Sequence, residues 1–234
     1  MLQPILDKII NDIYAGQNTL NEDYIHTISD LLNDAIYKSY NFDGNFNNPD
    51  FDSKDLDIIK ALTENVYQFS GAKNAALNKT LQELLIEDGE ILSFTNFNKK
   101  AKQVGLLFNK TYLKTENNTA ILQSQNIVDW NSFDDHDMLQ FSAVIDSHTA
   151  PLDRSLNGIA LPKSDSLWRF ATPQLHYNCR CRLIAVNDSL PSSLSKSKRS
   201  KIRSKIPKEF RNNPALTNEI FPKNHPYWRV VDGG

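Results

Sequence analysis

The chain has 234 residues, of which 40% are apolar and 23% charged, a composition typical of a globular protein with at least one substantial core. No apolar run approaches the roughly 20 residues of a membrane span. The first ten residues contain Asp7 and Lys8, so we expect neither a membrane segment nor a secretion signal. Two cysteines exclude a disulfide-rich secreted scaffold and favour an intracellular origin.

The net charge of −2 conceals a strong asymmetry along the chain. Residues 1–150 contain 11 basic and 22 acidic residues, whereas residues 151–234 contain 15 basic and 6 acidic residues. This division indicates either contact between the basic end and a polyanion or an internal match between an acidic and a basic layer. Charge alone leaves both interpretations open.

The amino-terminal part is predicted to be helical. Apolar residues recur three or four positions apart within residues 2–13, 24–36, 56–85 and 94–108, which places them on one face of a helix each time. Because no proline occurs from Ile91 to Trp130, we expect one or two long helices there. The side chains expected to face a core or another helix are Phe94, Phe97, Val104 and Phe108.

The pattern changes near Gln140. Alternating residues in 141–145 and 181–186 predict two short strands, followed by a Ser/Lys/Arg tract and an irregular end. The predicted fold class is α+β, with a mainly α-helical amino-terminal portion and a small mixed domain that carries the Asn-Cys-Arg-Cys strand. The expected regions are helical residues 1–139, the small α+β domain 140–190 and a basic, proline-containing extension 191–234.

Residues able to bind a metal or transfer a proton gather late in the chain: Asp146, His148, Asp153, His176, Cys179 and Cys181. The zinc candidates among them are His148, His176, Cys179 and Cys181. Cys-x-Cys is a weaker zinc signature than paired Cys-x-x-Cys, and two cysteines on one strand face also fit a small buried apolar pair. We therefore expect structural cysteines and no cofactor, with zinc as the alternative.

An enzyme would have to use the same residues. His148 and His176 are candidates for acid–base cleavage of a phosphodiester, and a cysteine is a candidate thiol nucleophile. The sequence has no nucleophile elbow, no glycine-rich phosphate loop and no His-Glu-x-x-His motif, and it holds only eight glycines. We expect no catalytic residue and no small-molecule substrate.

A basic tract follows, with a single acidic residue, Glu209, inside it. Its cations are Lys196, Lys198, Arg199, Lys201, Arg203, Lys205, Lys208 and Arg211. Closely spaced cations suit contact with the phosphate backbone of double-stranded DNA. No aromatic residue occurs in the tract before Phe210, so base stacking is not indicated. Docking on an acidic partner and a solvated linker are the alternatives.

Two stretches carry a family resemblance, VIDSHTAPLDRSLNGIALP (residues 144–162) and SLWRFATPQLHYNCRCRLIAV (residues 166–186). They resemble the signature of phage head morphogenesis proteins of the Mu F-like type, and weaker likeness extends the match to roughly residues 60–230. His148 stands where that family often has Arg, and Asp153 where it often has His or Cys. The signature positions are Asp146, Thr149, Leu156, Asn157, Gly158, Trp168, Asn178, Cys179, Arg180 and Cys181.

The resemblance implies a minor head protein, a structural component of the virion or procapsid. Its implied partners are the portal protein and other capsid proteins, with double-stranded DNA as a further partner, and its implied role is capsid assembly or DNA packaging and ejection. It would reside in the capsid interior or at the portal vertex, and in the host cytoplasm during assembly. A nuclease or toxin-related enzyme and a zinc-stabilised nucleic-acid-binding module remain the alternatives.

Overall fold

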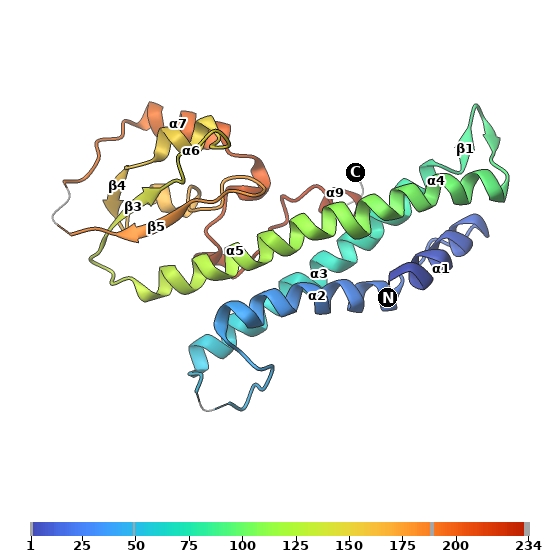
Figure 1. Ribbon diagram of the computed structural model, residues 1–234, viewed down its shortest axis with the longest axis horizontal. Helices are drawn as coiled ribbons and strands as arrows, with labels where there is room; N and C mark the ends of the chain where they lie inside the picture. Colours follow the sequence, from blue (N-terminus) through green and yellow to red (C-terminus); the bar gives the residue numbers. More distant parts are fainter. Residues whose placement is uncertain (1, 49, 188–189, 232–234) are drawn as a thin grey trace.

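The computed structural model describes residues 2–48, 50–187 and 190–231, which form an elongated helical body with a small sheet-containing lobe at one end (Figure 1). The body confirms the predicted helical amino-terminal part. Its elements are α1 (Leu2–Tyr14), α2 (Glu22–Tyr40), α3 (Ser53–Glu83), β1 (Ile86–Glu87), β2 (Glu90–Ile91), α4 (Phe94–Leu106), a π-helical segment (Leu107–Tyr112) and α5 (Leu113–Ser132).

Local sequence explains where these helices begin. Asn21, Asp52 and Ser93 precede α2, α3 and α4, and each side chain accepts a hydrogen bond from a backbone N–H of the first turn. After α3, Asp88 and Gly89 both have positive φ (53° and 83°). This backbone suits a two-residue hairpin turn, and the two residues join β1 to β2.

Residues 94–132 form one continuous helical run through α4, the π-helical segment and α5, as the absence of proline predicted. Phe97 and Phe108 are buried in the core, and Val104 packs against it. Phe94 is 39% exposed and meets the ring of Tyr14 edge-on, so it contacts another helix rather than the core.

The described residues of the sheet lobe form three short antiparallel strands in the order β4-β3-β5, with α6 and α7 on one side of the sheet and α5 along the other in Figure 1. Leu139 of the central strand pairs with Leu161 and with Ala185. The elements are β3 (Met138–Ser142), α6 (Pro151–Leu156), β4 (Ala160–Pro162), a 3-10 turn (Ser166–Arg169), β5 (Arg182–Ala185) and α7 (Lys196–Lys205).

One expectation for this lobe was wrong in detail. The strand expected over residues 141–145 ends at Ser142, and Val144 and Ile145 are exposed in a loop. The basic tract, for which the sequence predicted no secondary structure, is a helix: Ser195 caps α7, and Ile202 anchors it in the lobe. Neither feature was readable from alternation alone, because each depends on which residues find a core.

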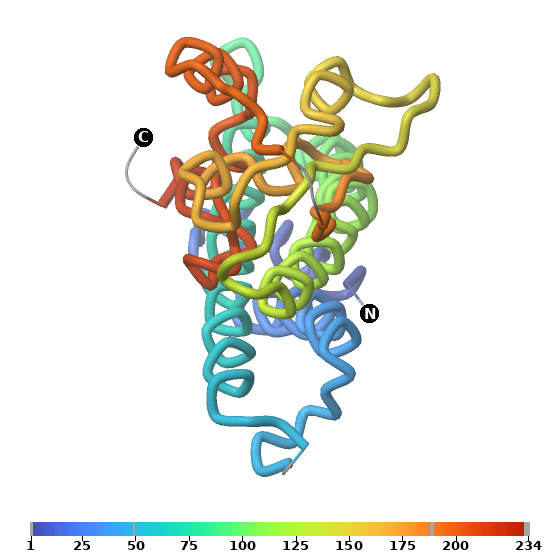
Figure 2. The backbone as a smooth tube through the Cα atoms, turned by 90° about the vertical axis from the view of Figure 1, so that its left-hand side faces the viewer, coloured from blue at the N-terminus to red at the C-terminus, as the bar shows by residue number. Residues whose placement is uncertain are grey.

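Two apolar cores hold the molecule together, one within the helical body and one within the lobe. After α7 the chain contributes Ile206 and Phe210 to the lobe core and then Ile220 and Phe221 to the helical core. The chain thus returns to the helical body at its carboxyl-terminal end. Figure 2 shows the loop between α2 and α3 projecting from the helical body. The last elements are a 3-10 turn (Lys208–Phe210), α8 (Pro214–Thr217) and α9 (Trp228–Val231).

Polar contacts fasten the returning segment to the helices. The Asn65 side chain accepts hydrogen bonds from the backbone N–H groups of Ile220 and Phe221 and donates one to the Phe221 carbonyl. The Phe221 ring stacks on Phe69 with 3.8 Å between centroids. The segment is therefore part of the packed structure. The boundaries 1–139, 140–190 and 191–234 remain a prediction.

Among the described residues, none of the helices combines the length and apolar character that crossing a membrane requires.

Candidate functional site

Asp146 organises the loop that follows β3. Its carboxylate accepts a hydrogen bond from the Arg180 guanidinium at 2.7 Å and another from the His148 backbone N–H at 2.8 Å. The Thr149 hydroxyl accepts from the Asp146 N–H and donates to the Val144 carbonyl. Arg180 and the His148 N–H hold the pKa of Asp146 well below its usual range, so the carboxylate stays ionised. These signature residues shape a surface loop.

The next signature residues turn the chain into β4. The Asn157 side chain accepts from the Ala143 N–H at 2.9 Å, and the Gly158 N–H donates to the Phe141 carbonyl at 2.8 Å. Gly158 has φ of +81°, a conformation that side chains disfavour. Leu156 and Trp168 are buried in the lobe core, and the Trp168 indole donates to the Pro162 carbonyl. This part of the signature therefore serves the fold.

Four residues of the types that bind metals come together in the lobe. Asp153 comes from α6, while His176, Cys179 and Cys181 come from the segment that leads into β5. Ligand atoms of Asp153, Cys179 and Cys181 all lie within 4.8 Å of one another, and all three residues are buried. His176 Nε2 lies 2.8 Å from Asp153 Oδ2, and its side chain is 31% exposed. The structure thus brings a carboxylate and two thiols together, and the imidazole of His176 joins them through its contact with Asp153.

Contacts within this cluster shift the pKa values of its members. The hydrogen bond to Asp153 raises the pKa of His176 to about 9 against the opposing effect of burial. The Cys181 thiol, by its hydrogen bond to Cys179, lowers the pKa of Cys179. The same contact, together with burial, raises the pKa of Cys181. The Cys179 thiol is therefore the one that ionises first.

His148, the remaining sequence candidate for zinc or catalysis, does not join this cluster. It is exposed in the Asp146 loop, and its backbone N–H, rather than its ring, binds Asp146. Within the part of the chain that the structure describes, no hydrogen bond links His148 to His176. The hydrogen-bond partner of the His176 ring is Asp153, and the acid–base pair of His148 and His176 stays a prediction.

The basic tract divides into two sets of side chains on α7 and its continuation. Arg199 forms a two-pronged ion pair with Asp165, Arg211 donates to the Ile206 carbonyl, and the Arg203 guanidinium lies 4.9 Å from the centre of the Phe170 ring. These three cations hold the helix on the lobe. The lysines of the tract are exposed and form no salt bridge within residues 2–48, 50–187 and 190–231: Lys196, Lys198, Lys201, Lys205 and Lys208.

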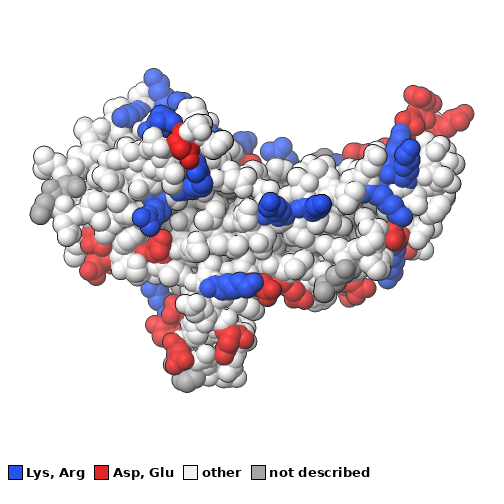
Figure 3. Space-filling view, in the orientation of Figure 1, with Lys and Arg blue, Asp and Glu red and all other residues white. Residues whose placement is uncertain are grey.

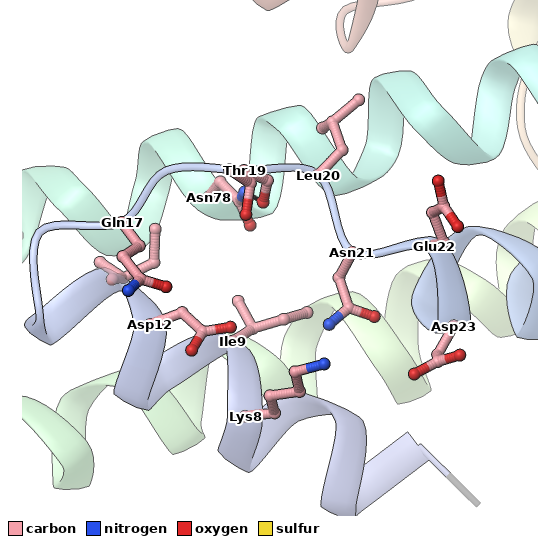
Figure 4. A pocket seen from close by; sticks show the side chains of 11 residues that line it. Lys8, Ile9, Asp12, Gln17, Thr19, Leu20, Asn21, Glu22, Asp23 and Asn78 are labelled. Carbon is pink, nitrogen blue, oxygen red and sulfur yellow. Dashed lines mark hydrogen bonds between the residues drawn. The ribbon is translucent and has the colours of Figure 1, made fainter.

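A pocket of about 420 Å³ lies between α1, the α1–α2 loop and α3, with Lys8 and Asp12 on one side and Thr19 and Asn78 on the other (Figure 4). The Asn78 amide donates to the Thr19 carbonyl at 2.9 Å, and the Asn21 N–H donates to Asn74. The buried amides of Asn74 and Asn78 therefore attach the α1–α2 loop to α3, and their role is structural.

Sequence reasoning missed the buried ion pair between Lys73 and Glu116 in the helical body. Lys73 is fully buried, and its Nζ lies 2.6 Å from Glu116 Oε2 and 2.9 Å from the Phe108 carbonyl. The Tyr227 hydroxyl donates to Glu116 Oε1 at 2.9 Å. The available signal was a lysine four residues after Phe69 on the apolar stripe of α3.

A family model described as Phage Mu protein F like protein matches residues 57–184, which is more than half of the chain. The matched range runs from α3 into β5 and includes the Asp146 loop and all four members of the buried cluster. The chain therefore belongs to the phage Mu protein F-like family, whose members are phage head morphogenesis proteins. No curated protein and no solved structure matches the chain.

Proposed function

We propose that this chain is a minor head protein of a phage virion or procapsid, associated with the portal and other capsid proteins. The observation that carries the proposal is the family match over residues 57–184. The role is structural: its partners are macromolecules, and the chain acts through surfaces rather than through a reaction.

The contact surface is the lysine face of α7, defined by Lys198, Lys201 and Lys205. Their spacing of three and four residues places them along one side of the helix, away from the arginines that hold it. Figure 3 shows Lys and Arg side chains gathered at the upper left, where α7 lies in Figure 1. A row of exposed cations on a rigid helix suits a phosphate backbone or an acidic protein surface.

Double-stranded DNA is the partner we assign to this lysine face, because packaged DNA is the dense polyanion of a phage head. The acidic helices of the body then make the protein contacts. Acidic side chains cluster on the loop below the body and at the hairpin tip in Figure 3, at a distance from α7. In this view the largest basic group and the two acidic groups lie in different regions of one face (Figure 3).

The test replaces Lys198, Lys201 and Lys205 together by Ala and measures affinity for a DNA duplex over a series of salt concentrations. Each phosphate contact contributes about −0.9 to the slope of log affinity against log salt. We expect a slope flatter by up to about 2.7 and equal weakening for unrelated sequences. The fold should persist, because exposed charges contribute little to stability.

The matched control replaces Lys99, Lys110 and Lys114, three exposed lysines of the long helix, by Ala. It removes the same charge and should leave the salt slope nearly unchanged. A lysine-face variant with an unchanged slope that no longer co-purifies with the portal ring would move the contact from DNA to the portal. If it retains both partners fully, α7 is a solvated helix and the assignment of this surface is wrong.

A further inference from the structure

We infer that Asp153, His176, Cys179 and Cys181 form a structural zinc site. The proposal concerns the lobe itself and holds whether or not the chain contacts DNA. It differs from the sequence expectation of two packed cysteines, and it replaces His148 by Asp153 in the ligand set.

The first support is the distance between the donor atoms. Tetrahedral zinc with bonds of about 2.3 Å to sulfur and about 2.0 Å to oxygen places a sulfur and an oxygen ligand roughly 3.5 Å apart. Cys179 Sγ and Asp153 Oδ2 are 3.7 Å apart. The donors of Asp153, Cys179 and Cys181 lie within 4.8 Å of one another, so small side-chain rotations close the site.

The second support is the local backbone. His176 and Cys179 are separated by two residues, and the Cys179 N–H donates to the His176 carbonyl, which turns the chain back on itself. Asn178 within this turn has φ of +60°. Two ligands with two residues between them on a tight turn match the ligand spacing of structural zinc sites. Cys181 then follows from the same segment and Asp153 from a separate helix.

The third support is a carboxylate atom without a partner. Asp153 is buried, and its Oδ1 has no hydrogen-bond partner among the described residues. Buried polar atoms are almost always satisfied, because leaving one unpaired costs about 1–3 kcal/mol. A zinc ion would use this free coordination capacity. His176 and the Cys179 thiol already contact Oδ2 of this carboxylate, so an apolar packing role for the two cysteines leaves only its Oδ1 without a partner in the described part of the chain.

The fourth support is the orientation of His176. Its Nδ1 lies 2.9 Å from the Tyr177 carbonyl, which can only accept a hydrogen bond, so Nδ1 carries a proton. Nε2 faces Asp153 Oδ2, another acceptor. A cation must therefore lie at Nε2: a proton in the metal-free chain, or zinc in the bound form. Holding Nδ1–H with a carbonyl while Nε2 binds is the usual arrangement of a metal-ligating histidine.

The site also has an entry path. The His176 side chain is 31% exposed, and Cys181 lines a groove of about 510 Å³ beside α5. Arg180 and Arg182 line the same groove and offset the negative charge of two thiolates and a carboxylate.

The experiment measures zinc in the purified full chain under reducing conditions and then titrates the chelator-treated protein with Zn²⁺ and with Co²⁺. We expect about one zinc per chain. With Co²⁺ we expect thiolate charge-transfer absorption and the visible bands of a tetrahedral ion. The variants are Cys179→Ser, Cys181→Ser, Asp153→Asn and His176→Ala, and the control is His148→Ala.

Cys179→Ser and Cys181→Ser should lose stoichiometric zinc, whereas His148→Ala should keep it. Because His176 is partly exposed, His176→Ala should remain folded and bind zinc at least about tenfold more weakly. Circular dichroism checks the fold of each variant. The proposal is overturned if folded wild-type protein takes up neither ion, or if the cysteine variants bind zinc as well as the wild type does. A Cys179–Cys181 disulfide that excludes metal even under reducing conditions also overturns it.

Discussion

Replacing Lys73 by Met tests how the helical body holds together. The Lys73 side chain is fully buried and that of Glu116 is 4% exposed. Among the described residues, removing the cation leaves the Glu116 carboxylate with only the Tyr227 hydroxyl as a hydrogen-bond partner. Met keeps the length of the side chain, so the main loss is electrostatic. Breaking a buried ion pair in this way costs about 3–5 kcal/mol.

Urea unfolding followed by far-ultraviolet circular dichroism measures the change. With an m-value of about 3 kcal/mol/M, the midpoint should fall by about 1–1.7 M. The double variant Lys73→Met/Glu116→Leu removes both charges and should recover most of the loss, because a buried ion pair is seldom more stable than apolar residues of similar volume. Lys79→Met, at an exposed position of α3, should change stability by less than about 0.5 kcal/mol.

A single-variant loss below about 1 kcal/mol would refute this reasoning, because it would mean that the carboxylate finds water or another donor without cost. So would a double variant as unstable as the single one. An unrecovered double variant would mean that the methylene packing of Lys73, rather than its pairing with Glu116, holds α3 against α5.

Two further predictions concern the same core. Phe97→Ala should cost about 3–5 kcal/mol because the ring is fully buried, and Phe94→Ala, at a 39% exposed position, should cost less than half as much; a loss below about 0.5 kcal/mol for Phe97 would remove it from the core. Burial and the nearby Lys73 charge lower the pKa of His225 to about 3, so the unfolded chain binds the extra proton below its own pKa of about 6.5. Above pH 6.5, His225 is neutral in both states and does not reduce the free energy of unfolding. Between pH 6.5 and 3, the free energy of unfolding falls by about 1.4 kcal/mol for each unit by which the pH is lowered. His225→Gln should remove that part of the pH dependence, whereas His136→Gln, at an exposed position, should retain it, and equal acid profiles for both variants would contradict the assignment.

The sequence by itself determined the helical part of the fold, because apolar spacing and capping residues are local signals. The stripe of Leu6, Ile9, Ile10 and Ile13 is buried as its period predicts. The interpretation of Cys179 and Cys181 as buried thiols next to exposed arginines agrees with the structure, but the expected Asn-Cys-Arg-Cys strand was wrong, because both cysteines precede β5. The family, too, is visible in short sequence motifs of fixed spacing.

Only the tertiary structure decided which distant residues meet. Asp153 lies 23 residues before His176, and Lys73 lies 43 before Glu116, so no local period relates the members of either pair. The ordering of the basic tract into α7 depends on Ile202 reaching the lobe core and on Arg199 reaching Asp165. Such contacts arise from the packing of elements, whose relative placement a single sequence does not encode as a repeating pattern. The zinc proposal and the lysine face both rest on that placement.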